Sequence, residues 1–149
     1  MVSGEWLVAS GEWIRRQDVS EESHMDSSKK PKSYEDLLVW QKGIRLVVLV
    51  YRITRAFPSD ERFGLMAQMR RAAVSVPSNI AEGQARHTTG EFIQAISHAE
   101  GSLAELETQL LIAIELGFCP DADARPALDS IDELQRMLHS LRTRLTNRR

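Results

Sequence analysis

The sequence of 149 residues lacks most of the features that mark a common functional class. It has one cysteine, Cys119, which excludes an intrachain disulfide and a multi-cysteine zinc site and is typical of a reducing cytosol. Its net charge is only −2, so the whole chain does not carry the positive field of a strongly basic nucleic-acid-binding domain. Any contact with nucleic acid must therefore come from a local group of basic residues.

Long apolar segments are missing as well. The longest apolar run covers residues 46–51, far fewer than the roughly 20 residues that a membrane-spanning helix needs. Residues 6–14 are interrupted by Gly11 and Glu12, so they do not form the apolar region of a secretory signal. We therefore expect a cytoplasmic protein without a membrane partner.

Catalytic and metal-binding motifs are equally scarce. The sequence has no HExxH, CxxC, Walker or GxGxxG motif. A di-iron helical bundle needs Glu-x-x-His pairs on its core helices, and the only such pair, Glu21 with His24, lies near the N-terminus. Cys119 precedes Pro120 in a predicted turn with no evident base, which indicates a packing residue. We expect no catalytic residue, no metal and no cofactor, and hence no enzyme.

The first 32 residues differ from the rest. They are rich in Ser, Glu, Asp and Lys and sustain no apolar period, so we predict a disordered extension before a domain at 33–147. Two copies of Ser-Gly-Glu-Trp, at 3–6 and 10–13, belong either to an unstructured tail or to a docking element. A separate hypothesis is that translation starts at Met25.

The first helix is expected at 34–57. Ser33 is a suitable N-cap with Asp36 three residues later, and Pro58 would stop the helix. The β-branched residues of 44–53 would also suit a strand, but the length of the periodic segment favours a helix. The apolar residues at helical spacing are Trp40, Ile44, Val47, Val48 and Tyr51.

The second helix is expected to open near Ser59 and to continue beyond Asn79. Its apolar positions alternate in steps of four and three, the pattern of a bundle seam. Pro77 lies inside this seam and removes one backbone donor, which predicts a kink. Ser75 is expected to satisfy backbone groups near the proline, and Asn79 to be a buried amide that fixes helix register. Ser75 and Asn79 form the predicted structural polar core, although Asn79 could instead face a ligand.

Two more helices complete the domain. Thr88 or Thr89 caps the third, which ends at Gly117. Asp121 or Asp123 opens the fourth, with Pro126 in its first turn. Because the connections are short, neighbouring helices should be antiparallel. The sequence therefore predicts an all-α protein, an up-down antiparallel four-helix bundle whose second helix is kinked near Pro77.

The first predicted helix has apolar residues around most of its circumference. A helix that packs only within its own bundle needs a single apolar face. The additional apolar residues are Leu38, Leu46, Leu49, Val50 and Ile53. The second face needs a cover, and self-association into a closed homo-oligomer is the simplest one.

The C-terminal stretch is basic. No acidic residue follows Glu133, whereas several arginines do. Arg142 and Arg144 are therefore candidate contacts to RNA or DNA, although cations are also favoured at the C-terminus of any helix.

Three segments give the chain a family resemblance. Residues 61–65 read ERFGL, residues 68–83 read QMRRAAVSVPSNIAEG, and residues 99–110 read AEGSLAELETQL. With these motifs in order, residues 34–145 closely resemble the four-helix bundle proteins encoded in intervening sequences of bacterial 23S ribosomal RNA genes. The resemblance implies an up-down bundle that assembles into a homopentamer, similar to the accessory variability protein of diversity-generating retroelements. That protein is a basic barrel that binds nucleic acid and a reverse transcriptase.

Carried to this sequence, the resemblance makes Arg70, Arg71 and Arg86 candidate phosphate contacts, with Arg52 and Arg55 as helpers. It implies no reaction, so the partners to expect are other copies of the chain, RNA or DNA, and a reverse transcriptase. The leading hypothesis is an oligomeric, nucleic-acid-associated accessory factor.

The alternative is a structural or protein-scaffolding oligomer. In that case the arginines of the motif would pair with Glu61, Glu82 or Glu105. Beyond residue 32 there are 14 Lys and Arg against 15 Asp and Glu, so the domain as a whole is close to neutral. Which hypothesis applies depends on where the arginines lie and what they contact.

Overall fold

The structure, a computed structural model, describes residues 6–9, 12–15 and 37–148. The chain divides into two units, residues 1–31 and 32–149. In the first unit, β1 (Trp6–Ala9) pairs with β2 (Glu12–Arg15) as antiparallel strands, with Trp6 opposite Arg15. These strands lie in the segment that the composition predicts to be disordered. Met25, Ser33 and Asp36 lie outside the described residues, as does most of the predicted extension, whose disorder stays a prediction.

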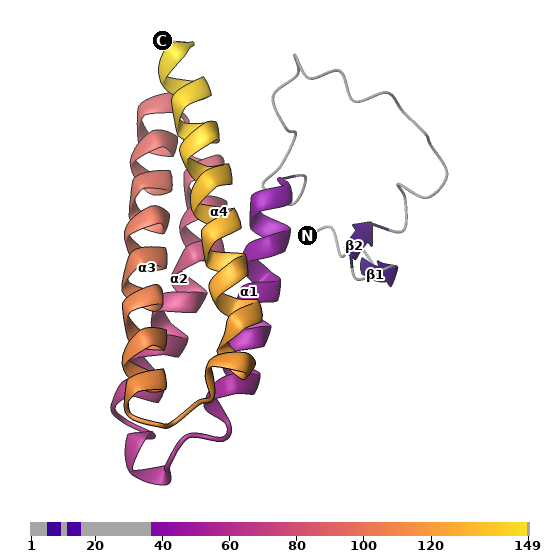
Figure 1. Ribbon diagram of the computed structural model, residues 1–149. Helices are drawn as coiled ribbons and strands as arrows, with labels where there is room; N and C mark the ends of the chain where they lie inside the picture. Colours follow the sequence, from indigo (N-terminus) through magenta and orange to yellow (C-terminus); the bar gives the residue numbers. More distant parts are fainter. Residues whose placement is uncertain (1–5, 10–11, 16–36, 149) are drawn as a thin grey trace. The chain divides into compact units, whose positions relative to one another are not determined.

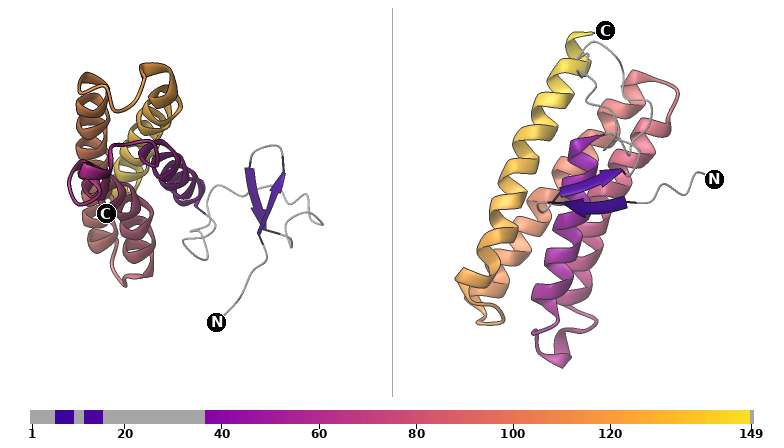
Figure 2. Two further views of the ribbon diagram at one scale, coloured as in Figure 1. Left: turned by 90° about the horizontal axis from the view of Figure 1, so that it is seen from below. Right: turned by 90° about the vertical axis from the view of Figure 1, so that its right-hand side faces the viewer.

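The second unit is a bundle of four long helices (Figure 1). These are α1 (Leu38–Thr54), α2 (Leu65–Ala85), α3 (Thr89–Glu115) and α4 (Asp121–Asn147), with a short 3₁₀ helix, η3 (Ser59–Glu61), before α2. Each helix packs against its neighbours in sequence, and α1 also packs against α4, which closes the bundle (Figure 2). The predicted all-α, up-down four-helix bundle is confirmed.

The ends of α3 follow from local chemistry. The hydroxyl of Thr88 accepts a hydrogen bond from the backbone of Glu91, and the Glu91 carboxylate accepts one from the backbone of Thr88. This reciprocal capping box satisfies amides that have no partner within the helix. At the other end, Gly117 adopts a φ of 74°, which a residue without a side chain tolerates best. Both predicted ends of the helix are confirmed.

The predicted starts of α1 and α2 were wrong. α1 begins at Leu38 rather than at residue 34, because Leu37 is extended. α2 begins at Leu65 rather than near Ser59, because Gly64 departs from helical dihedral angles after η3. A carboxylate oxygen of Glu61 accepts a hydrogen bond from the Leu65 amide at 2.9 Å, so Glu61 caps α2 from outside the helix.

Both helical prolines are accommodated within continuous helices. Pro77 is buried in α2, and the kink that we expect there stays a prediction. Ser75 and Ser78 beside it donate to the carbonyls of Ala72 and Val74, as expected of serines near a helical proline. Pro126 is the sixth residue of α4, so its predicted place in the first turn was wrong.

The side of α1 that faces the core differs from the predicted one. Leu46 and Val50, assigned above to the second apolar face, are fully buried. Val48 and Tyr51, from the predicted core stripe, are 39% and 40% exposed. Gly43 sets this orientation from one side, because a Cβ there would lie 3.3 Å from Cβ of Pro77 in α2. Trp40 and Val47 of the predicted stripe still pack against the core, and Leu38 of the predicted second face is 51% exposed, so the predicted division of α1 into two faces was wrong in part.

Candidate nucleic-acid interface

Arg70 of α2 is held in place by contacts other than an ion pair with any described carboxylate. Its Nε donates to the hydroxyl of Thr54 at 2.9 Å, and its guanidinium lies 4.4 Å from the centre of the Tyr51 ring. Thr54 is fully buried in α1 and itself donates to the carbonyl of Val50 at 2.8 Å. The orientation of Arg70 is therefore fixed while its other guanidinium donors stay available. That combination suits recognition of an anion.

Arg70 lies in a stretch of the sequence that contains four other arginines. We name residues 51–71 the arginine segment: it covers the end of α1, the connection with η3, and the start of α2. The segment contains Arg52, Arg55, Arg62, Arg70 and Arg71. Among the described residues, no acidic side chain forms an ion pair with any of them. With Asp60 and Glu61 as its only acidic residues, the segment has a net charge of +3.

Arg71 follows Arg70 in sequence but lies on a different side of α2. It lies on the exposed side of α2 and lines a groove of about 470 Å³ between α2 and α3, together with Gln68, Ser75 and Glu105. The predicted alternative for the motif arginines was pairing with Glu61, Glu82 or Glu105, and among the described residues Arg71 forms an ion pair with none of the three.

Arg86 lies at the opposite end of α2 and has a partner. Its guanidinium donates to the Glu82 carboxylate at 2.6 Å, one helical turn away. This hydrogen bond and the negative charge raise the pKa of Arg86 further above its usual range. Arg86 therefore forms the ion pair with Glu82 that the scaffolding hypothesis predicts. The structure does not bring Arg86 together with the arginine segment.

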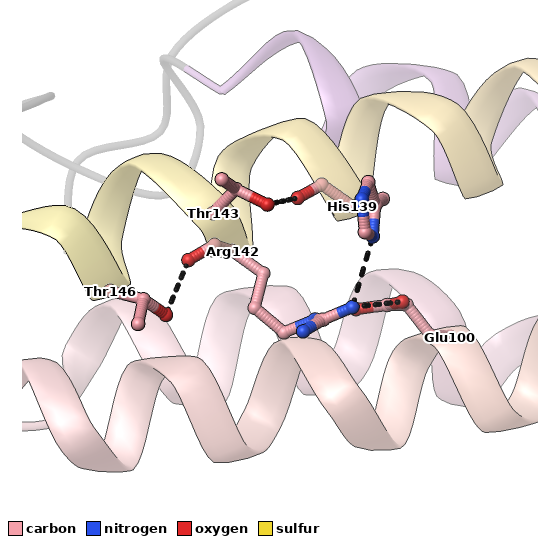
Figure 3. A network of polar contacts seen from close by, with 5 residues as sticks. All are labelled: Glu100, His139, Arg142, Thr143 and Thr146. Carbon is pink, nitrogen blue, oxygen red and sulfur yellow. Dashed lines mark hydrogen bonds and ion pairs between the residues drawn. The ribbon is translucent and has the colours of Figure 1, made fainter.

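Arg142 belongs to a network that joins α4 to α3 (Figure 3). Its Nε donates to one oxygen of the Glu100 carboxylate at 2.7 Å, and its Nη2 lies 3.4 Å from the other. Nη2 also lies 3.0 Å from Nδ1 of His139, which must act as the acceptor because a guanidinium only donates. Glu100 raises the pKa of Arg142 above its usual range.

The two C-terminal candidates thus differ. Arg142 joins two helices, which is a structural role. Arg144 is exposed and lines a groove of about 550 Å³ between α1 and α4, beside the apolar residues Leu38 and Leu141. Neither arginine lies in the arginine segment, so the candidate contacts predicted from the sequence do not form one continuous group.

The predicted polar core lies at a surface. Ser75 and Asn79 are both half-buried, and the amide of Asn79 donates to the carbonyl of Ser75 at 2.7 Å within α2. Asn79 lines a polar groove of about 440 Å³ between α2 and α3, with Glu82, Arg86, Gln94 and His98. Within one copy of the chain, the expectation of a buried amide was therefore wrong, because its seam position turns toward this groove.

Comparison with known proteins assigns the fold to a family. A model of the 23S rRNA-intervening sequence protein family matches residues 35–140, which include all of α1, α2 and α3 and most of α4. The chain belongs to this family. A comparison with curated proteins found no match. In this family member, both long motifs of the sequence lie on packed helices, and only part of each is exposed.

The structure reveals site residues that sequence reasoning missed. Arg62 and Phe63 lie in the turn before α2, where Phe63 is 88% exposed, and Thr54 orients Arg70 from inside α1. The ERFGL motif contains two of these residues and was a usable signal, but its exposure was not evident. Thr54 gave no signal, since its role depends on a partner 16 residues away.

Other chemistry finds little support in the described part of the chain. No group of His, Cys, Asp and Glu there could hold a metal ion. Cys119 is buried, and this burial raises the pKa of its thiol and keeps it protonated, as suits a packing residue. None of the described helices is both long and apolar enough to cross a membrane.

Proposed function

We propose that the protein is a non-enzymatic homo-oligomer, a pentamer, that associates with RNA or DNA as an accessory factor. The observation that carries the nucleic-acid role is the arginine segment, whose five arginines have no acidic partner among the described residues. Nucleic-acid affinity depends largely on phosphate contacts of this kind. Several copies in one assembly would present several such segments to one nucleic acid and so raise the effective affinity.

The oligomer is supported by exposed apolar residues on the outer sides of α1 and α2. Tyr51 of α1 contacts Arg70 of α2. The two helices are antiparallel. Val48 lies about one turn before Tyr51 on α1, and Val74 lies about one turn after Arg70 on α2, so both valines lie on the same side of the Tyr51–Arg70 contact. Val48 and Val74 are each about 40% exposed and form what we name the α1–α2 apolar strip. Contiguous exposed apolar residues on one surface are typical of an interface.

The subunit number can be measured directly. Native mass spectrometry at micromolar concentration should show pentamers, and a monomer would refute this part of the proposal. Val74→Asp should dissociate the assembly, because it would bury a charge in the apolar strip. The matched control is Thr108→Asp, an exposed residue of α3 outside the strip, which should leave the subunit number unchanged.

Nucleic-acid association is tested by a salt series. Binding of a structured RNA should weaken steeply as salt rises, with a slope that becomes shallower by about 2 when Arg52, Arg55 and Arg71 are all replaced by Gln. Arg125→Gln is the control, since Arg125 is neutralised by Asp121 one turn away at 2.9 Å. If the wild-type protein shows no salt-sensitive binding at low ionic strength, the nucleic-acid role fails.

The second candidate function is a structural or protein-scaffolding oligomer. The observation in its favour is that Arg86 and Arg142 pair with Glu82 and Glu100. A reverse transcriptase is the protein partner implied by the resemblance to accessory variability proteins. Co-purification with a reverse transcriptase in the absence of nucleic acid would favour scaffolding.

A further inference from the structure

The turn between η3 and α2 presents an aromatic ring to solvent. The side chain of Phe63 is 88% exposed, the largest exposed fraction among the described large apolar residues. Packing at this end of the bundle does not involve it: Phe57 is buried there instead and contacts Phe118 with ring centres 5.6 Å apart. Phe63 therefore contributes little to the core of a single copy, and its exposure calls for a different explanation.

Arg62 lies beside this ring, and two more arginines precede it in the arginine segment. The guanidinium of Arg62 lies 5.5 Å from the ring centre, and Arg52 and Arg55 occupy the last residues before the connection. The acidic residues of the same connection are Asp60 and Glu61, and the Glu61 carboxylate accepts a hydrogen bond from the amide of Leu65. Glu115, Asp121 and Asp123 lie at the same end of the bundle, on either side of Phe118 in the α3–α4 connection. In a two-fold contact, an identical surface from a second copy would bring like charges together, which disfavours dimerisation through this turn.

A second pair of the same kind lies close by in the arginine segment. The Arg70 guanidinium lies over the ring of Tyr51 at 4.4 Å, and Tyr51 is 40% exposed. Exposed aromatic rings among unpaired arginines are the combination with which proteins bind single-stranded nucleic acid: bases stack on the rings and phosphates contact the cations. In a duplex the bases are already stacked and paired, so their faces are not available.

We propose that Phe63 is a stacking platform for an unpaired base, so that this end of the bundle binds single-stranded RNA or DNA. Arg62 and Arg55 bind phosphates that flank the stacked base, and Tyr51 with Arg70 extends the surface toward the next nucleotides. This inference rests on the proposed nucleic-acid function and specifies its ligand.

The test uses the full-length protein and a labelled 12-nucleotide single-stranded RNA of mixed sequence, with the same sequence as a duplex for comparison. Phe63→Ala and Phe63→Leu should each raise the dissociation constant for the single strand about 10-fold, the effect of losing one base–aromatic stack. Phe63→Trp should preserve or tighten binding. Leu38→Ala is the matched control, an exposed apolar residue at the start of α1, and should have no effect. The duplex should bind more weakly than the single strand, and with equal affinity to all variants.

The comparison of Ala with Leu separates stacking from ordinary apolar contact. If Phe63→Leu binds like the wild type, only apolar bulk is needed and the inference is overturned. It is also overturned if the wild type binds RNA but Phe63→Ala binds equally well, which leaves the proposed function intact. A changed subunit number in native mass spectrometry with unchanged affinity would assign the turn to a contact between copies. If the wild type binds neither RNA form at low salt, both proposals fail.

Discussion

At Gly83, α2 packs tightly against α3, and substituting this glycine tests the packing of the bundle. A Cβ at this position would lie 2.5 Å from Cβ of Ala95 and 2.9 Å from a ring carbon of Phe92. Carbon atoms pack at about 3.5–4.0 Å, so Gly83→Ala requires a shift of about 1 Å. The Ala95 Cβ is fixed to its backbone, so the helices themselves must move apart.

Two opposing contributions decide the magnitude. Replacing glycine by alanine inside a helix contributes about 0.5–1 kcal/mol of stability. Forcing an extra carbon into a packed core costs about 1–3 kcal/mol, and the contact with a backbone-fixed atom places Gly83→Ala toward the upper end. We expect a net loss of about 2 kcal/mol in the free energy of unfolding. For a domain of this size the loss lowers the melting temperature by roughly 6–12 °C.

The chain supplies a matched control for this substitution. Gly101 lies in the middle of α3, and a Cβ there would have no neighbouring atom within 4 Å. Gly101→Ala should therefore raise stability by about 0.5–1 kcal/mol. Urea unfolding and thermal melting should be compared at one protein concentration, because assembly makes both concentration-dependent. If Gly83→Ala is as stable as Gly101→Ala, the close approach of α2 and α3 does not exist.

Four further substitutions test other parts of the structure. Thr88→Ala removes the capping box and should cost about 1 kcal/mol in urea unfolding at neutral pH; no loss would show that the cap does not stabilise α3. The hydrogen bonds from Thr88 also lower the pKa of Glu91 in the folded protein. The ionised Glu91 therefore stabilises the fold fully at pH values above its pKa in the unfolded chain, and this stabilisation is lost as the pH falls through the lower pKa of the folded protein. As the pH is lowered, the free energy of unfolding should therefore fall less for Glu91→Gln than for the wild type. An equal fall in both proteins would contradict this. Gln109 is buried in α3 with an oxygen that has no partner among the described residues, while its Nε2 donates to Glu105 at 3.2 Å. Gln109→Met removes the buried unpaired oxygen and loses only this long, partly exposed bond, so it should raise stability by about 1 kcal/mol; a loss would contradict the view that the oxygen is unpaired. Thr54→Val removes the acceptor that orients Arg70 while keeping the shape of the side chain; RNA affinity should fall while the melting temperature changes by only a few degrees, and unchanged affinity would rule out this positioning role.

Features that depend on nearby residues were predictable from the sequence. The capping box of α3 and the glycine after it use residues within one or two turns, and both ends of that helix were placed correctly. The start of α2 was missed because the favourable signals at Ser59 and Asp60 form only η3, and Gly64 then interrupts the helix.

The face of α1 could not be chosen from its own sequence. A helix with apolar residues on most sides has no unique apolar direction, so its orientation is decided by the helices beside it. Here Gly43 admits Pro77 of α2, and Lys42 forms an ion pair with Glu133 of α4 at 2.9 Å. These partners lie 34 and 91 residues along the chain and leave no periodic signal.

The candidate site was predictable only in part. The pairing of Arg86 with Glu82 follows from their spacing of four residues on one helix. The pairing of Arg142 with Glu100 does not, because the two residues meet across helices. The exposure of Phe63 was also missed, since an aromatic residue in a family motif is more often expected in a core.

The connection of α2 to α3 by residues 86–88 also determines the order in which the bundle should fold. Contacts between these two helices close short loops, whose entropic cost is low. Contacts between α1 and α4 join opposite ends of the domain and can form only after most of the chain has been ordered. We therefore expect the α2–α3 hairpin to be the folding nucleus, and the backbone amides of α1 and α4 to exchange with solvent before those at the centre of α2 and α3.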